Sequence, residues 1–133
     1  MHSLLDEAMV GATDIARSTK FYDAALGALG LERLRASERY VGYVTKGNPA
    51  GHPQFWICLP FNKEAATSGN GTQIGFRAAD RASVDRFHAA AMAHGGTDEG
   101  KPGLRTHYHP NYYGAYIRDP DGNKVCIVCH KAP

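Results

Sequence analysis

The chain has 133 residues, of which 43% are hydrophobic and 21% charged, and a formal net charge of +2. This composition predicts one globular domain with a hydrophobic core, and the weak, scattered positive charge argues against nucleic-acid or membrane partners. No apolar run reaches the roughly 18 residues that a membrane-spanning helix needs, no signal-peptide pattern opens the chain, and three cysteines without an export signal predict reduced thiols in the cytoplasm.

The first half of the chain predicts a strand, a helix and three further strands. Residues 4–12 are short and apolar, as in a strand, and Asp14 is suited to cap a helix that ends at Gly27–Gly30. Turn-like breaks separate three candidate strands, at residues 31–36, 39–45 and 54–59. The polar, glycine-rich residues 63–71 then predict a linker.

The second half predicts the same order of elements. A strand is expected at residues 72–78, a helix at 80–94, a long loop at 99–111 and strands at 112–118 and 124–129. The turn Asp119–Asn123 between the last two strands has proline where φ is preset and glycine where φ can be positive. It therefore predicts a hairpin.

The two halves also match residue by residue. A shift of 66 positions places Asp14 on Asp80, Phe21 on Phe87 and Gly30 on Gly96. These residue types suit a helix cap, a helix core face and a helix end respectively. We therefore interpret the chain as a single domain, 1–133, built from a first module of about residues 1–62 and a second of about 71–133, with function expected in the cleft between them.

Two segments carry a family resemblance: TDIARSTKFYDAALGALG at Thr13–Gly30 and YYGAYIRDPDGNKVCIV at Tyr112–Val128. They resemble the vicinal oxygen chelate superfamily, which includes glyoxalase I, extradiol dioxygenases and the bleomycin and fosfomycin resistance proteins. The resemblance implies an α+β fold in which two βαβββ modules form a cupped mixed sheet, and it implies a homodimer. It does not specify the reaction, because one fold can host several.

Metal-dependent members of that superfamily hold a divalent cation with one ligand from each of four strands. The motifs place these positions at Glu7, Trp56, Gln73 and Cys126, and the 66-residue shift relates Glu7 to Gln73. An indole cannot ligate a metal, and one carboxylate, one amide and one thiol suit neither a hard cation nor zinc. The standard metal site is therefore predicted to be lost or rebuilt, and we assign no metal ligand and no cofactor.

Strand alternation predicts which side chains face the cup. If Glu7 faces it, then Trp56, Gln73 and Cys126 do so as well. The neighbouring residues on the same strands are expected in the core: Phe55, Ile57, Ile74 and Phe76.

The expected loop at residues 99–111 is the densest polar and aromatic region of the sequence. It carries Arg105, His107 and His109 and leads into Tyr112. Long loops of this content are often functional. Two interpretations stay open, a loop that grips the substrate and a structural flap over the sheet edge.

The string Cys126–His130 matches the attachment motif of c-type haem. Residues three apart on a strand point to opposite faces, so both thiols cannot readily reach one haem edge. We therefore reject haem, and the same geometry argues against a disulfide between Cys126 and Cys129.

These observations predict a cytoplasmic, glyoxalase-like homodimer that binds a small organic molecule in its cup. Glu7 is the candidate general base. The remaining site residues are predicted to bind the substrate: Trp56, Gln73, Arg105, His107, His109, Tyr112 and Cys126. Two alternatives remain, a metal-dependent lyase or dioxygenase with an atypical ligand set and a non-catalytic, drug-sequestering binder.

Overall fold

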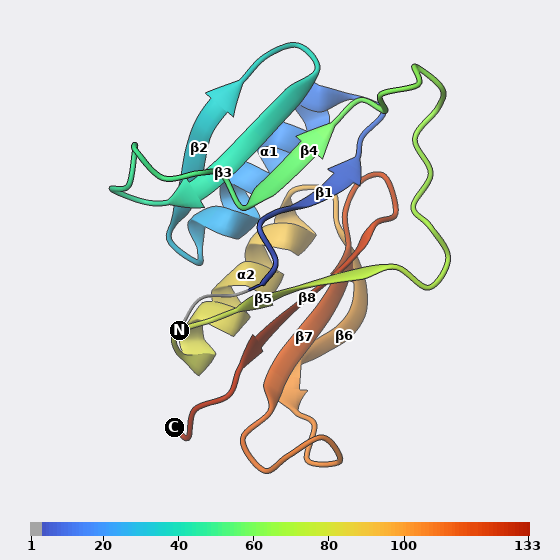
Figure 1. The fold of residues 1–133 in the computed structure, drawn as a ribbon. Helices are drawn as coiled ribbons and strands as arrows, with labels where there is room; N and C mark the ends of the chain where they lie inside the picture. The colour runs from blue at the N-terminus through green and yellow to red at the C-terminus, as the bar shows by residue number, and fades with distance from the viewer. Residues whose placement is uncertain (1–3) are drawn as a thin grey trace.

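The computed structural model describes residues 4–133 and contains two helices and two four-stranded sheets (Figure 1). The elements of module one are β1 Ala8–Gly11, α1 Ile15–Gly27, β2 Leu31–Ala36, β3 Tyr40–Thr45 and β4 Phe55–Cys58. Its sheet has the order β1-β4-β3-β2, in which β1 and β4 run parallel and the other neighbours antiparallel. The sheet is therefore mixed, because β4, the last strand of the module, lies parallel to and beside β1, the first strand.

Module two repeats this topology. Its elements are β5 Gln73–Arg77, α2 Arg81–Ala93, β6 Thr97–Leu104, β7 Tyr113–Arg118 and β8 Lys124–Cys129. The strand order is β5-β8-β7-β6, again with one parallel pair, between β5 and β8. Residues 59–72 connect the modules without helix or strand. The predicted α+β fold of two βαβββ modules is confirmed.

The predicted loop at residues 99–111 is wrong over its first part. Thr97–Leu104 is strand β6, and a loop connects it to β7 only from Arg105 onward. The sequence did not predict this strand, because Gly100, Pro102 and Gly103 are poor strand formers. Because β6 lies at the sheet edge and shifts register on both sides of Gly100, it accommodates a proline and glycines that a central strand would not.

Both helices begin as the sequence predicts. The Asp14 carboxylate accepts the N–H of Arg17 at 3.1 Å, and the Asp80 carboxylate accepts the N–H of Ser83 at 2.7 Å. Each bond satisfies a backbone donor that has no partner within the helix. Gly30 follows α1 with φ +83°, a left-handed conformation that glycine adopts without strain. Neither helix in residues 4–133 has the length and apolar character needed to cross a bilayer.

One hydrophobic core runs through both modules. It includes Phe21 of α1 and Phe87 of α2, each fully buried. Across the modules, the rings of Phe55 on β4 and Phe76 on β5 meet edge to face at 5.1 Å. Burial of such a side chain contributes about 1.5–3 kcal/mol. The predicted alternation is confirmed, because Phe55 and Ile57 are buried while Trp56 between them faces the opposite side of the sheet.

The turn Asp119–Asn123 bonds module two to module one. Asp119, only 3% exposed, accepts the Tyr22 hydroxyl of α1 at 2.7 Å and the backbone N–H groups of Asp121 and Asn123, each at 2.9 Å. Asp121 accepts the Ser18 hydroxyl at 2.9 Å, and the Asn123 amide donates to the Gly11 carbonyl at 2.9 Å. The hairpin turn is thereby tied to the start of α1 and the end of β1. Burial, together with Asp119, raises the pKa of Tyr22, so its phenol stays a donor.

Tyr22→Phe tests this connection. We expect a loss of about 1–3 kcal/mol in the free energy of unfolding, because Asp119 would keep its buried charge and lose one donor. Urea denaturation at neutral pH measures it. Tyr113→Phe is the matched control, since Tyr113 donates to Asp85 at 2.7 Å in an exposed position. Equal losses in the two variants would contradict a special role for the buried bond.

Candidate functional site

Trp56 lies on the face of the β1–β4 sheet that is turned away from the helices. Its ring packs edge to face against Tyr40 at 5.7 Å. It also covers Gly42 of β3, where a Cβ atom would lie 2.7 Å from the indole ring and 2.9 Å from Pro53. Among the described residues the buried indole N–H has no hydrogen-bond partner. Trp56 is therefore held by packing, and the absence of a side chain at Gly42 leaves room for the indole ring.

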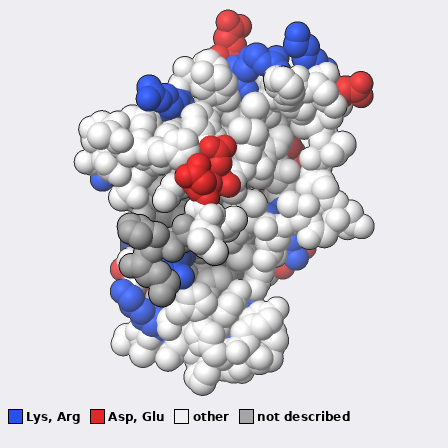
Figure 2. Space-filling model, in the orientation of Figure 1, with Lys and Arg blue, Asp and Glu red and all other residues white. Residues whose placement is uncertain are grey.

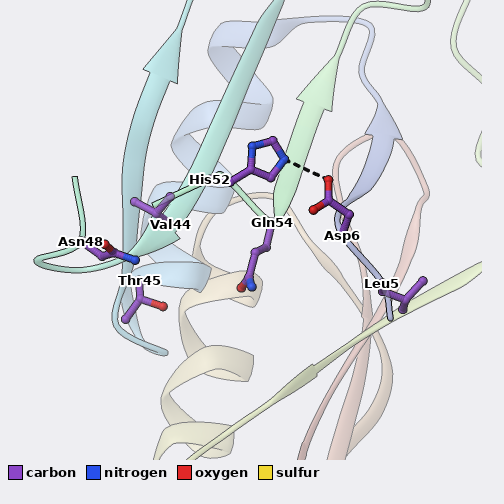
Figure 3. A pocket seen from close by; sticks show the side chains of 7 residues that line it. All are labelled: Leu5, Asp6, Val44, Thr45, Asn48, His52 and Gln54. Carbon is purple, nitrogen blue, oxygen red and sulfur yellow. Dashed lines mark ion pairs between the residues drawn. The ribbon is translucent and has the colours of Figure 1, made fainter. Parts of the chain in front are cut away.

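Glu7 directly precedes β1 of the same sheet and lies in an exposed, polar setting. Its side chain is 39% exposed, and its carboxylate is 3.2 Å from Nε2 of His52. Nε2 of His52 is also 3.2 Å from the Asp6 carboxylate. Figure 3 shows His52 reaching toward Asp6 beside a hollow whose lining is Leu5, Asp6, Val44, Thr45, Asn48, His52 and Gln54. Sequence reasoning missed Asp6 and His52, because His52 belongs to an irregular loop with no motif.

A second hollow, of about 530 Å³, lies on the open face of the β5–β8 sheet. Its lining consists of Gln73, Glu99, Arg105, Tyr108, Tyr112, Tyr116 and Lys124. The strand register explains the gathering, because Gln73 pairs with Lys124 and Tyr116 pairs with Cys126 on neighbouring strands. Three predicted site residues, Gln73, Arg105 and Tyr112, are thus brought together.

Tyr116 stands at the centre of this second hollow. Its hydroxyl is 2.9 Å from that of Tyr112, and the charged groups of Arg105 and Lys124 each lie 5.6 Å from its ring centre. The carbonyls of Gly103 and Lys101 fix the Arg105 guanidinium, each at 2.8 Å. Burial and the hydrogen bond with Tyr112 raise the pKa of Tyr116, so its phenol stays protonated.

The charge of this hollow is positive on balance. Its carboxylate, Glu99, is bonded to Arg118 at 2.7 Å. Within residues 4–133, neither Arg105 nor Lys124 forms an ion pair with a carboxylate. Two cations and the protonated phenol of Tyr116 therefore face the same space. Tyr116 and Lys124 were missed as site residues, although strand alternation from Cys126 and from the hairpin could have found them.

The four positions that the motifs align with the metal ligands of the superfamily come from both modules. Trp56 lies on β4 of one sheet and Glu7 just before its strand β1, whereas Gln73 and Cys126 lie on strands of the other sheet. The Gln73 amide nitrogen is 3.6 Å from the Cys126 sulfur. Burial raises the pKa of the Cys126 thiol, with a smaller opposing effect of Lys124, so the thiolate that a metal needs is disfavoured. These residues therefore do not fit that metal.

His107 and His109 follow Arg105 on the loop but do not line the second hollow. The His107 ring lies 4.2 Å from that of Tyr108. His109 stacks on His130, with Nε2 of His109 2.8 Å from Nδ1 of His130. Nδ1 of His109 accepts the N–H of Asn111 at 3.1 Å, so Nε2 of His109 carries the proton donated to His130. His109 therefore braces the loop against the end of the chain.

A sequence model of the Glyoxalase/Bleomycin resistance protein/Dioxygenase superfamily matches residues 4–127. The chain belongs to this superfamily. No curated protein sequence matches it significantly.

Solved structures of the superfamily resemble this chain over nearly its whole length. A glyoxalase/bleomycin resistance protein from Albidiferax ferrireducens T118 is 43% identical, with a TM-score of 0.84 over 97% of this chain and 100% of that one. A glyoxalase/bleomycin resistance protein/dioxygenase family enzyme from Burkholderia phytofirmans PsJN is 22% identical, with a TM-score of 0.72 over 97% and 100%. A lactoylglutathione lyase from Agrobacterium tumefaciens is 22% identical, with a TM-score of 0.63 over 96% and 94%. The last two share the fold alone.

Gly42→Ala tests the packing of the Trp56 ring over Gly42. The added methyl group would collide with the indole, so we expect emission of this single tryptophan to shift to longer wavelength. We also expect a loss of about 1–3 kcal/mol in stability from overpacking. Fluorescence and urea denaturation measure the two effects. Gly27→Ala is the control, because a Cβ at the end of α1 meets nothing within 4 Å. Unchanged emission in Gly42→Ala would disprove the proposed contact.

Proposed function

We propose that this member of the superfamily binds a small organic anion in the hollow of the β5–β8 sheet. The observation that carries the proposal is the convergence of Arg105 and Lys124 on the ring of Tyr116. Neither cation has a carboxylate partner in the described chain. A carboxylate, enolate or phenolate ligand would supply the missing negative charge.

The other groups of the hollow favour a planar ligand. Tyr108 and Tyr112 present rings whose centres lie 4.7 Å apart, and such rings stack well on flat molecules. The protonated phenol of Tyr116 and the Gln73 amide can donate hydrogen bonds to ligand oxygens. A volume of about 530 Å³ lies within the range of small-molecule sites. We therefore assign Gln73, Arg105 and Tyr112 to ligand binding, as the sequence predicted, and add Tyr116 and Lys124.

The arrangement favours binding over chemistry within one chain. The hollow offers cations and hydrogen-bond donors, while Glu7, the candidate base, lies just before the first strand of the other sheet. The four superfamily metal positions do not fit a metal, so a lyase or dioxygenase that uses that set gains no support. The separation of Glu7 from the hollow favours instead a protein that sequesters its ligand without converting it. Catalysis by this chain would require Glu7 to reach a ligand held by module two.

Arg105→Ala tests the ligand site with benzoate and salicylate as probes. We expect saturable binding by isothermal titration calorimetry, weakened at least about tenfold in Arg105→Ala and in Lys124→Ala, because each removes a charge-assisted bond. Benzamide should bind more weakly than benzoate. Arg35→Ala is the control, since Arg35 is exposed on β2 of module one. Equal affinity of Arg105→Ala and the native chain, or no preference for the anion, would overturn the proposal.

We further propose that two copies associate through these open faces. Charge complementarity supports this: Figure 2 shows a compact group of acidic side chains where the chain enters β1, while Arg105 and Lys124 lie on the face of module two. Met9 on the first face and Tyr108 beside the second are apolar side chains exposed by 51% and 60%. Contact between unlike faces would bring Glu7 of one copy toward the ligand of its partner.

Light scattering coupled to size-exclusion chromatography measures this association. We expect a mass of two chains that falls toward that of one chain when salt is raised, because screening weakens the attraction between the faces. Met9→Lys should also favour the monomer, whereas Phe61→Lys in the connecting segment should not. A monomer at all salt concentrations would contradict the proposal.

We also propose a cytoplasmic location. It is supported by the free thiols of three cysteines, Cys58, Cys126 and Cys129.

A further inference from the structure

The cluster Asp6–Glu7–His52 is a second concentration of polar chemistry, and the ligand site of module two does not use it. Two segments that lie 45 positions apart form it. The parallel pairing of β1 with β4 aligns Ala8 with Phe55, and the N–H of Ala8 donates to the Gln54 carbonyl at 3.0 Å. The residues that precede the two strands are therefore held side by side on the open face of module one.

We propose that Asp6, Glu7 and His52 bind a divalent metal ion of the borderline class, such as Zn²⁺ or Co²⁺. Nε2 of His52 lies 3.2 Å from a carboxylate oxygen of Asp6 and 3.2 Å from one of Glu7. The ligand atoms of all three side chains lie within 4.8 Å of one another. Ligands bonded at about 2.0–2.2 Å, at angles between square and tetrahedral, are separated by about 2.8–3.6 Å. The two separations from Nε2 of His52 fall within this range, and the two carboxylates, within 4.8 Å of each other, lie close enough to approach the same ion.

The donor set selects the class of ion. Imidazole nitrogen suits zinc, cobalt, nickel and copper better than magnesium or calcium, and two carboxylates supply the charge that a dication needs. Three protein ligands leave further coordination positions for water or substrate. A simple ion pair accounts for the cluster less well, since a single Nε2–H would have to serve two carboxylates at the same distance.

The space beside the cluster provides a second observation. A hollow of about 290 Å³ is lined by Asp6 and His52 together with the polar side chains of Thr45, Asn48 and Gln54 (Figure 3). These hydroxyl and amide groups line the same hollow as Asp6 and His52. A hollow with polar walls admits water, which would occupy the coordination positions that the three protein ligands leave open.

The site differs from the one that the superfamily implies. It shares Glu7 with that set and replaces the other three positions by two residues, Asp6 and His52, from the same module. It also lies apart from the ligand site, because the two hollows share no lining residue. Loss of one site can therefore be measured without loss of the other.

Isothermal titration calorimetry of the full chain with Zn²⁺ at pH 7.5 tests the proposal. We expect one ion per chain, with binding at least tenfold weaker in His52→Ala and in Asp6→Asn. His107→Ala is the matched control, because His107 is also exposed and lies outside the cluster; its affinity should stay within twofold of the native value. Absorption of bound Co²⁺ in the visible range reports the coordination independently, and the bands should be lost in His52→Ala.

Three outcomes would overturn the proposal. The first is no binding of Zn²⁺ or Co²⁺ to the native chain. The second is equal affinity in His52→Ala and His107→Ala, which would indicate surface histidines only. The third is loss of binding in His107→Ala with retention in His52→Ala, which would move the metal to the loop of module two. Benzoate binding by His52→Ala should stay unchanged, so a failure of this proposal is distinguishable from a failure of the ligand site.

Discussion

The buried carboxylate of Asp119 is the constraint on which the rest of the structure depends. A charge removed from water is tolerated only when its oxygens are hydrogen-bonded. Here the donors come from two modules, with the Tyr22 hydroxyl from α1 and the N–H groups of the turn itself. Because these bonds require one relative position of α1 and the hairpin, they align the shared core. The opposite faces of both sheets are left for function.

The duplicated fold carries different chemistry on its two halves. Glu7 and Gln73 are equivalent by the 66-residue shift, and each lies at or just before the start of the first strand of its module. Glu7 joins Asp6 and His52, so module one presents carboxylates and an imidazole. Gln73 pairs with Lys124 on the neighbouring strand, so module two presents cations and phenols. The same backbone thus supports a candidate metal site in one half and a candidate anion site in the other.

Burial keeps the groups of module two in their protonated forms. The raised pKa values of Tyr116 and Cys126 both arise first from removal of water around the side chain. A protonated phenol and thiol are poor bases and poor metal ligands, but the phenol is a good hydrogen-bond donor. For the proposed ligand site, these protonated groups favour an anion that is already charged in solution.

Apart from β6, the sequence by itself determined the elements, their order and the faces of the strands, because caps, turns and alternation are local properties. Asp14 and Asp80 cap their helices as predicted, and Phe55 and Ile57 enter the core as predicted. Strand β6 escaped prediction, since its glycines and Pro102 are tolerated only at a sheet edge. Only the tertiary structure decided that Glu7 joins His52 rather than Gln73. The reason is physical: contact between distant segments depends on strand pairing and on the packing of the modules, which no local pattern records.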